Sequence, residues 1–421
     1  MKMIDYNYIS ELDNSDPLKH YREKFWIPKD DKGEDLIYLC GNSLGLQPKL
    51  TEKYLHQELE DWKKLGVEGH THAQNPWMPY HELLTDKMAA LVGAKPIEVV
   101  MMNSLTVNLH LLMVSFYRPD KKRYKILIEN DAFPSDKYAV ESQLKFHGFD
   151  PKEGLLTWKP LTGETTLRYE VLEDLLAREG ENIALILIGG VNYYTGQAFD
   201  LQKISQLGHS YGCVVGFDLA HMAGNINPNL HDSEVDFAAW CTYKYLNSGP
   251  GSVAGCFVHE RHAYDVDIPR FTGWWGHNKT TRFNMRHEFD PIPGAEGWQL
   301  SNPPILSMAA IRASLDVFSE AGMESLRDKS LKMMNLQDEI LSNISSDIFD
   351  IITPSSPNER GCQMSIRIRN ANKEVFNKLL LAGVISDWRE PGVIRIAPTP
   401  FYNSFKDIYF FYQKLSQILN L

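Results

Sequence analysis

Residues 213–218 read CVVGFD, and this stretch decides the fold that we predict for the chain. Apolar or small residues run without interruption up to Asp218, which is typical of a strand buried on both faces that ends in a carboxylate. A similar apolar run covers residues 183–191, and a helical pattern at 201–211 lies between the two. Strands that alternate with helices predict βαβ units and a mainly parallel sheet.

The alternation extends in both directions from this stretch. Further strands are predicted at 125–129, 236–242 and 255–258, and a further helix at 135–146. Beyond residue 305 the pattern changes to two long helices and then to shorter strands. We therefore predict a large α/β domain at 50–330 and a smaller α+β C-terminal domain at 331–421. An N-terminal arm, residues 1–49, is expected to pack with the small domain.

The composition excludes several classes of protein. The 421 residues include 43 basic and 54 acidic side chains, a net charge of −11 that argues against nucleic-acid or anionic-membrane partners. No apolar run approaches the ~20 residues that span a bilayer, and no secretory signal is visible near residue 1. The five cysteines are scattered without a C-x-x-C pair. This pattern predicts a reduced, cytoplasmic protein without a disulfide scaffold.

Two charged residues at predicted strand ends point to a ligand site. Asp218 ends one strand, and Lys244 follows another, 244 − 218 = 26 residues later. The carboxyl ends of parallel strands are where α/β sheets bind ligands. Pyridoxal phosphate chemistry needs a lysine for the Schiff base and a carboxylate that keeps the pyridine nitrogen protonated. The alternative is that Asp218 and Lys244 form only a structural ion pair.

A phosphate group could bind at the start of a predicted helix. Residues 103–106 read NSLT and precede a helical pattern at 107–114. Free backbone N–H groups at a helix N-terminus bind anions, although the same residues could form a simple helix cap.

Four other motifs do not fit the chemistry that they suggest. Residues 41–45 read GNSLG, the pattern of a hydrolase nucleophile elbow, but almost no strands precede them. Residues 249–254 fit G-x-G-x-x-A, yet Pro250 interrupts them and a strand follows. His81 opens an H-E-x-x-H motif whose second histidine is missing, and His70-x-His72 lacks a third ligand. We predict no metal site.

Eight stretches in order carry a resemblance to a known family: GNSLGL (41–46), LTVNLH (105–110), FPSD (133–136), YTGQ (194–197), GFDLAH (216–221), YKYLN (243–247), GWWGH (273–277) and SNPP (301–304). On these motifs the chain resembles the kynureninases, which are pyridoxal-phosphate enzymes of fold type I in the class V aminotransferase superfamily. The resemblance implies a large domain of that fold with a smaller C-terminal domain. It also implies hydrolysis of L-kynurenine and/or 3-hydroxy-L-kynurenine to anthranilate or 3-hydroxyanthranilate plus L-alanine. That reaction belongs to tryptophan catabolism and feeds NAD biosynthesis.

The resemblance also assigns roles to residues of this chain. The implied catalytic residues are Lys244 (Schiff base), Asp218 (pyridine nitrogen) and Tyr243. The implied cofactor-binding residues are Leu105, Thr106, Phe133, Asp136, Asp218, His221, Tyr243, Lys244, Trp274 and Asn302. The implied substrate-binding residues are Ser43, His70, Asn302 and Arg395, with Arg395 on the carboxylate. Trp274 would reach a phosphate in the neighbouring subunit, which implies a homodimer with its active site at the interface. Gly189 departs from relatives that carry a hydroxyl residue there.

Several alternatives stay open at this point. A cysteine desulfurase or an aminotransferase of the same fold would share most of these motifs, and Cys362 is the candidate thiol of a desulfurase. A serine hydrolase would use Ser43, and a binding protein would use the fold without catalysis. His70 and Asn302 favour the 3-hydroxylated substrate, because they could hydrogen-bond its phenol. Tyr243 is a candidate proton donor and acceptor or only a phosphate ligand.

Overall fold

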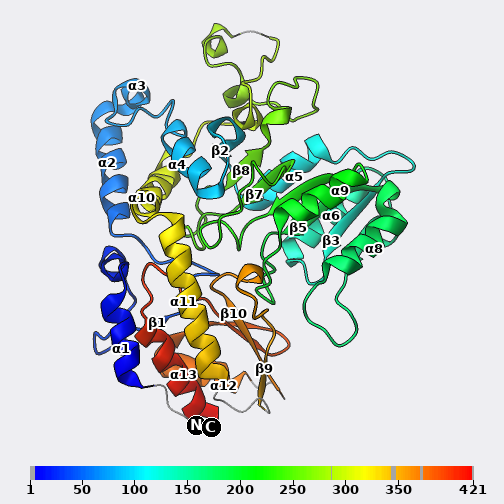
Figure 1. Ribbon diagram of the computed structural model, residues 1–421. Coiled ribbons are helices and arrows are strands. Elements are labelled where there is room, and N and C mark those ends of the chain that lie inside the picture. Colours follow the sequence, from blue (N-terminus) through cyan, green and yellow to red (C-terminus); the bar gives the residue numbers. More distant parts are fainter. Residues whose placement is uncertain (1–4, 286, 343–347, 370–372, 420–421) are drawn as a thin grey trace.

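The computed structural model describes residues 5–285, 287–342, 348–369 and 373–419. Its largest sheet has seven strands in the order β2-β8-β7-β6-β5-β3-β4 (Figure 1). The strands are β2 (Val99–Met101), β3 (Lys125–Glu129), β4 (Leu155–Trp158), β5 (Ile183–Gly189), β6 (Val214–Asp218), β7 (Phe237–Trp240) and β8 (Gly255–Val258). β3 to β7 are parallel to one another, and β2 and β8 form an antiparallel edge. The prediction of a mainly parallel sheet is confirmed.

Helices cover both faces of this sheet because its central strands are apolar on both sides. Along β5, Leu185 and Leu187 pack with α5 (Leu105–Phe116) and α6 (Pro134–Phe146). The alternate residues, Ile186 and Ile188, pack with α8 (Tyr169–Glu179) and α9 (Leu201–Ser210). Successive side chains of a strand point to opposite faces, so one continuous apolar run fills both layers.

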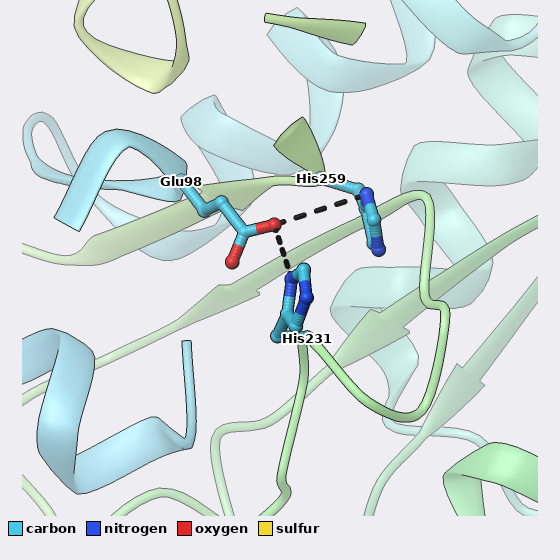
Figure 2. Close-up of side chains that lie close together, drawn as sticks. All are labelled: Glu98, His231 and His259. Carbon is cyan, nitrogen blue, oxygen red and sulfur yellow. Dashed lines mark hydrogen bonds and ion pairs between the residues drawn. The ribbon is translucent and has the colours of Figure 1, made fainter. Parts of the chain in front are cut away.

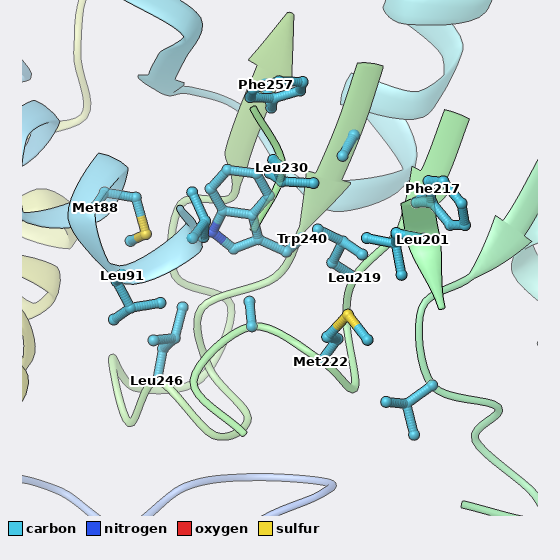
Figure 3. Packing of buried hydrophobic residues seen from close by; sticks show 14 of the residues in the cluster. Met88, Leu91, Leu201, Phe217, Leu219, Met222, Leu230, Trp240, Leu246 and Phe257 are labelled. Carbon is cyan, nitrogen blue, oxygen red and sulfur yellow. The ribbon is translucent and has the colours of Figure 1, made fainter. Parts of the chain in front are cut away.

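The second of these layers is built around a fully buried tryptophan of β7. Trp240 lies between Met88 of α4 (Glu82–Val92) and Phe257 of β8 (Figure 3). On the opposite face of β7, Phe237 explains the glycine of the CVVGFD stretch. A Cβ added to Gly216 would lie 2.2 Å from Phe237 Cζ, which is closer than real Cβ atoms approach other atoms.

A second, four-stranded sheet forms the centre of the C-terminal region. Its order is β12-β13-β10-β9, all antiparallel, with β9 (Phe349–Ile351), β10 (Met364–Ile368), β12 (Asp387–Arg389) and β13 (Val393–Ile396). α11 (Met323–Ser342), α12 (Glu374–Leu381) and α13 (Phe405–Leu419) share its apolar core. β1 (Ile37–Tyr38) pairs with β11 (Val384–Ile385).

The N-terminal arm divides between the two cores. Ile9 of α1 (Tyr6–Ser15) and Leu39 lie in the core of the four-stranded sheet, and α1 lies beside α13 in Figure 1. Tyr21 and Phe25 instead lie in the core of the large sheet. The domain boundaries that we predict near residues 49 and 330 stay a prediction.

The remaining helices lie beside the antiparallel edge of the large sheet or connect its strands. They are α2 (Leu50–Leu65), α3 (Gly69–His72), α7 (Pro151–Gly154) and α10 (Ile305–Ala321). α10 packs against α2 and α4 (Figure 1). The strand predicted at 236–242 ends earlier, at Trp240, because the chain turns there: Ser248 N–H donates to Thr242 O. Within the described residues, no helix is long and apolar enough to cross a bilayer.

At the amino-terminal ends of the parallel strands, just before β7, polar side chains cluster around the buried Asp236. Its carboxylate accepts hydrogen bonds from His209 Nε2 at 2.9 Å and His262 Nε2 at 3.0 Å, and from Arg261 Nη2 at 2.7 Å. Burial alone raises the pKa of Asp236, but the two histidine hydrogen bonds and the charge of Arg261 outweigh burial and hold the pKa well below its usual value.

We predict that Asp236→Asn destabilises the protein at pH 7 by about 1–3 kcal/mol, because it removes the charged acceptor shared by the partly exposed Arg261, His209 and His262. A depressed carboxylate pKa stabilises the fold above the unfolded pKa, and this contribution is lost as the pH falls through the folded value. The difference in Tm between the wild type and the variant should therefore reach its largest value at pH 7 and become smaller below about pH 4. Thermal melts across that range measure it, and equal Tm values at pH 7 would contradict the prediction.

Candidate active site

A cavity of about 340 Å³ opens at the carboxyl ends of β3, β5 and β6. Its wall brings together ten of the thirteen predicted site residues: Ser43, Leu105, Thr106, Phe133, Asp136, Asp218, His221, Tyr243, Lys244 and Arg395. The position agrees with the rule that α/β sheets bind ligands at the carboxyl ends of their strands.

Lys244 and His221 form the central pair of the cavity. Lys244 Nζ lies 3.0 Å from His221 Nε2, and the other ring nitrogen of His221 is buried without a hydrogen-bond partner. Burial and the nearby charge of Lys244 hold the pKa of His221 well below its usual value, so the imidazole is neutral at pH 7. A neutral Nε2 accepts a hydrogen bond from the Lys244 amine and fixes its direction.

Three carboxyl groups converge beside Lys244. Asp218 accepts a hydrogen bond from Ala220 N–H at 2.7 Å, and its side chain shares a hydrogen bond with Asp136. Burial raises the pKa of Asp218, and the charge of Lys244 opposes that effect. Burial and then the charge of Asp218 raise the pKa of Asp136 well above its usual value. A buried carboxylate in such a group favours a cationic N–H partner.

The third carboxyl group is Glu129, which we did not predict. Burial raises the pKa of Glu129 to about 7, and its Oε1 accepts a hydrogen bond from Gly189 N–H at 3.2 Å. A Cβ on Gly189 would lie 2.8 Å from that oxygen, so Glu129 leaves no room for a side chain at position 189. The signal was available in the sequence, since Glu129 ends β3 as Asp218 ends β6.

The N-terminus of α5 supplies donors for an anion. Ser104 precedes the helix without capping it, and Leu105 and Thr106 line the cavity. Thr106 Oγ1 lies 2.9 Å from Ser135 Oγ, so two hydroxyl groups stand beside these amides. Free amides and hydroxyl groups at the start of a twelve-residue helix are the donors that a phosphate group would need.

The aromatic ring of Phe133 also lines the cavity. Phe133 precedes α6 and is 42% exposed, and Lys244 Nζ lies 5.9 Å from the centroid of its ring. A flat apolar face, a lysine, a buried carboxylate and a phosphate site are the features that pyridoxal phosphate needs. The residues present fit that cofactor.

Arg395 provides positive charge elsewhere on the wall. Arg395 is 1% exposed, its Nη1 donates to Tyr193 O at 2.6 Å, and its Nη2 forms an ion pair with Asp387. Its Nε is buried without a partner. Arg389, which we did not predict, also lines the cavity and lies 3.1 Å from the same Asp387 carboxylate.

Ser43 lies on a loop whose shape is structural. Gly45 N–H donates to Tyr243 O at 2.8 Å, and a Cβ on Gly45 would lie 2.2 Å from Lys244 O. The GNSLG motif therefore allows this loop to pack directly on the Lys244 backbone. Within the described residues, no hydrogen bond joins the Ser43 hydroxyl to a histidine, so the structure does not favour a serine hydrolase.

Three predicted site residues lie outside the cavity of the single chain. His70 packs in α3 with its ring 5.5 Å from that of Trp77. Trp274 is 44% exposed, and its Nε1 donates to Arg282 O at 3.3 Å. Asn302 is exposed in the segment before α10. The single chain therefore does not bring these three predicted site residues to the cavity.

The cysteines do not provide a reactive thiol. Cys362 is buried, and burial raises its pKa to about 12. Cys40 lies half-buried near Asp387, where burial and that carboxylate also raise its pKa to about 12. A persulfide-forming cysteine needs an accessible thiolate, so the geometry does not favour a desulfurase.

Two groups of histidines and carboxylates outside the cavity have the composition of metal ligands. In Figure 2, His231 and His259 face one oxygen of Glu98. That oxygen accepts hydrogen bonds from His231 Nδ1 at 2.9 Å and Glu260 N–H at 2.8 Å, and His259 Nδ1 accepts one from Arg261 N–H at 3.1 Å. The lone pairs that a metal would need are thus used inside the protein.

The second group consists of His81, Glu82 and Glu296. Lys279 Nζ lies 2.8 Å from Glu82 Oε1 and 2.7 Å from Glu296 Oε2. An ammonium group therefore already occupies the place of a cation. We interpret both groups as structural ion clusters.

Comparison with solved structures shows the fold. The cystine C–S lyase C-DES with glycine covalently linked to its PLP cofactor superposes with a TM-score of 0.76, at 15% identity, over 94% of this chain and 98% of that chain. The apo cysteine desulfurase from Thermococcus onnurineus NA1 gives a TM-score of 0.74 at 16% identity over 98% of each chain. The predicted fold class, fold type I of the PLP-dependent enzymes, is confirmed.

Comparison with curated sequences shows the family. The model "Kynureninase C-terminal domain" matches residues 326–415. The kynureninase of Koribacter versatilis is 56% identical over 98% of both chains. That of Myxococcus xanthus is 54% identical over 97% of this chain and 96% of its own. That of Flavobacterium psychrophilum is 51% identical over 97% of both. At this identity over nearly its whole length, the chain belongs to the kynureninase family.

Proposed function

We propose that the chain hydrolyses L-kynurenine and 3-hydroxy-L-kynurenine to L-alanine and the corresponding anthranilate, with pyridoxal phosphate as cofactor. The observation that carries this proposal is one cavity that holds Lys244, Asp218 and Arg395 together. The kynureninase relatives support the same reaction. The reaction balances as substrate plus one water giving two amino acids, with cleavage of the Cβ–Cγ bond.

Pyridoxal phosphate, when bound, supplies an electron sink for the electrons released at the substrate α- and β-carbons. Lys244 would hold it covalently, and the buried Asp218 carboxylate would keep its ring nitrogen protonated. The amides at the start of α5 and the Thr106 hydroxyl would bind its phosphate, and Phe133 would lie against its ring. Trp274 and Asn302 are proposed to reach it from a second subunit.

Three side chains of the cavity bind the substrate or move protons. Lys244 Nζ takes the proton from the substrate α-carbon, and the neutral His221 beside it keeps the amine in reach. Burial raises the pKa of Tyr243, so its phenol stays protonated and can donate a proton to the departing carbon or a hydrogen bond to the phosphate. Arg395 binds the α-carboxylate.

Parallel assays test the proposed function. Purified holoenzyme is incubated with kynurenine, with 3-hydroxykynurenine and with cysteine. Alanine and an anthranilate should form from the first two, and no sulfide from the third. We expect a higher kcat/KM for 3-hydroxykynurenine, because His70 and Asn302 can hydrogen-bond its phenol. Equal values would contradict the ring preference alone, whereas sulfide from cysteine together with no alanine from either kynurenine would overturn the function.

The active unit that we propose is a homodimer with its site at the interface. An apolar hollow is lined by Trp62, Trp77 and Ile305. The His70 ring packs against that of Trp77, and Asn302 lies two residues before the lining residue Pro304. Trp62 is 61% exposed in the single chain, although a large apolar side chain gains stability by burial. This surface suits a second copy, whose contact would bring His70, Trp274 and Asn302 to the neighbouring cavity.

Mixed dimers test this arrangement. We predict that Lys244→Ala and Asn302→Ala are each strongly impaired as homodimers, and that mixing the two after dissociation restores activity. Each mixed dimer contains one site with both wild-type side chains if Asn302 comes from the partner. Activity after co-refolding, compared with each variant refolded alone, gives the answer. No recovery in verified mixed dimers would contradict the shared site.

A further inference from the structure

Two arginines on the cavity wall are held by one carboxylate. Asp387 of β12 is the direct cross-strand partner of Arg395 of β13, and the two side chains form an ion pair. The same Asp387 oxygen, Oδ2, lies 3.1 Å from Arg389 Nη2. Asp387 is only 11% exposed, so both guanidinium groups share a largely buried anion.

This arrangement leaves positive charge and donors unused. Two guanidinium groups face one carboxylate, which leaves one net positive charge at this part of the wall. The Nε atoms of Arg389 and Arg395 are both buried without a hydrogen-bond partner. Buried donors that lack a partner cost free energy until a ligand supplies an acceptor.

The geometry also limits what Arg395 can do alone. Its Nη1 donates to Tyr193 O and its Nη2 pairs with Asp387, so Nε is its only nitrogen without a protein partner. A carboxylate bound in a fork needs two parallel N–H donors. Besides Nε–H, the second donor can be the remaining N–H of Arg395 Nη2, whose other N–H faces Asp387, or an N–H of the neighbouring Arg389.

We propose that Arg389 is a second substrate-binding residue, which joins Arg395 in binding the substrate α-carboxylate, and that Asp387 is the positioning residue that keeps both guanidinium groups at the cavity. This inference rests on the proposed function. Arg389 is 38% exposed in the single chain, whereas Arg395 is 1% exposed. Arg389 can therefore meet the carboxylate as it enters, and Arg395 holds it in its final position.

The test is steady-state kinetics of the holoenzyme with kynurenine. Arg389→Gln should raise KM by about tenfold or more, the loss of one hydrogen bond to a charged group, with kcat nearly unchanged. Arg389→Lys should recover part of that loss because it restores the charge. Asp387→Asn should raise KM as well, because both arginines lose their common anchor. Arg367→Gln is the matched control, since Arg367 lies in the same sheet and pairs with Asp350.

A ligand without the carboxylate separates binding from a structural role. The decarboxylated analogue of kynurenine should inhibit the wild type and Arg389→Gln with the same Ki, while KM for kynurenine differs. The proposal would be overturned if Arg389→Gln raised the Ki of the analogue by the same factor as the KM of kynurenine. An unchanged KM for kynurenine in Arg389→Gln would also overturn it. A wild type that forms no alanine from kynurenine would instead refute the proposed function. In that case, the Kd of an α-amino acid such as L-alanine is measured from the cofactor absorbance. The same Kd for the wild type and Arg389→Gln would also overturn the role of Arg389.

Discussion

Replacement of Lys244 by alanine is expected to lower the rate of anthranilate formation by at least about 10⁴-fold. Among the described residues that line the cavity, Lys244 carries the only amine, and the proposed function gives this amine two tasks: to hold the cofactor and to move the substrate α-proton. His221 cannot take over the second task, because burial keeps its pKa far below neutrality and leaves it a weak base. Stopped assays of anthranilate fluorescence measure the rate.

Two controls make this result specific. Lys203→Ala removes an exposed lysine that pairs with Glu173 away from the cavity, and it should leave the rate unchanged. The absorption spectrum of Lys244→Ala should show that the variant still binds the cofactor. Denaturation should then release this cofactor, because it has no covalent bond to the protein. A variant that keeps more than a few per cent of the wild-type rate would show that Lys244 has been assigned wrongly.

Replacement of Asp218 by asparagine is the second large effect that we expect, a loss of about 10³-fold in kcat. Asparagine has nearly the same shape and can still accept the Ala220 N–H hydrogen bond, so the change removes mainly the negative charge. Without it, no full charge at that position favours the protonated ring nitrogen, and the electron sink weakens. Rates are measured at saturating cofactor, so that weaker binding does not enter the result.

Asp200→Asn is the matched control for the same chemical change. Asp200 caps α9 by accepting Lys203 N–H and lies outside the cavity, and asparagine can still accept that hydrogen bond, so kcat should stay nearly unchanged. If Asp218→Asn turned over as fast as Asp200→Asn, the role of Asp218 at the ring nitrogen would be wrong.

The fold could be predicted because its central strands carry unambiguous patterns. The run at 125–129 is β3 and the strand predicted at 255–258 is β8. The run at 183–191 contains β5, which ends at Gly189, and the CVVGFD stretch contains β6, which begins at Val214. The antiparallel direction of β8 was not predicted, since strand direction depends on the connection and leaves no local pattern. The strand predicted at 236–242 extended too far because Cys241 and Thr242 look strand-like, whereas the turn before Lys244 ends β7 at Trp240.

The site was predictable where it follows strand ends and motifs. Asp218 and Lys244 were found because a charged residue after an apolar run is conspicuous, and Glu129 carries the same signal. Arg389 and Asp387 could not be found in this way. Their role depends on the register of β12 against β13, which places Asp387 opposite Arg395 and which sequence does not encode locally.

The most direct test of the central claim is the fate of water oxygen during turnover of kynurenine in H₂¹⁸O. Hydrolysis of the Cβ–Cγ bond places oxygen from water in the carboxylate of anthranilate, while the carboxylate of alanine keeps its original oxygens. We predict equal amounts of ¹⁸O-labelled anthranilate and unlabelled alanine by mass spectrometry. Formation of a 2-oxo acid in place of alanine, or anthranilate without ¹⁸O, would contradict the account.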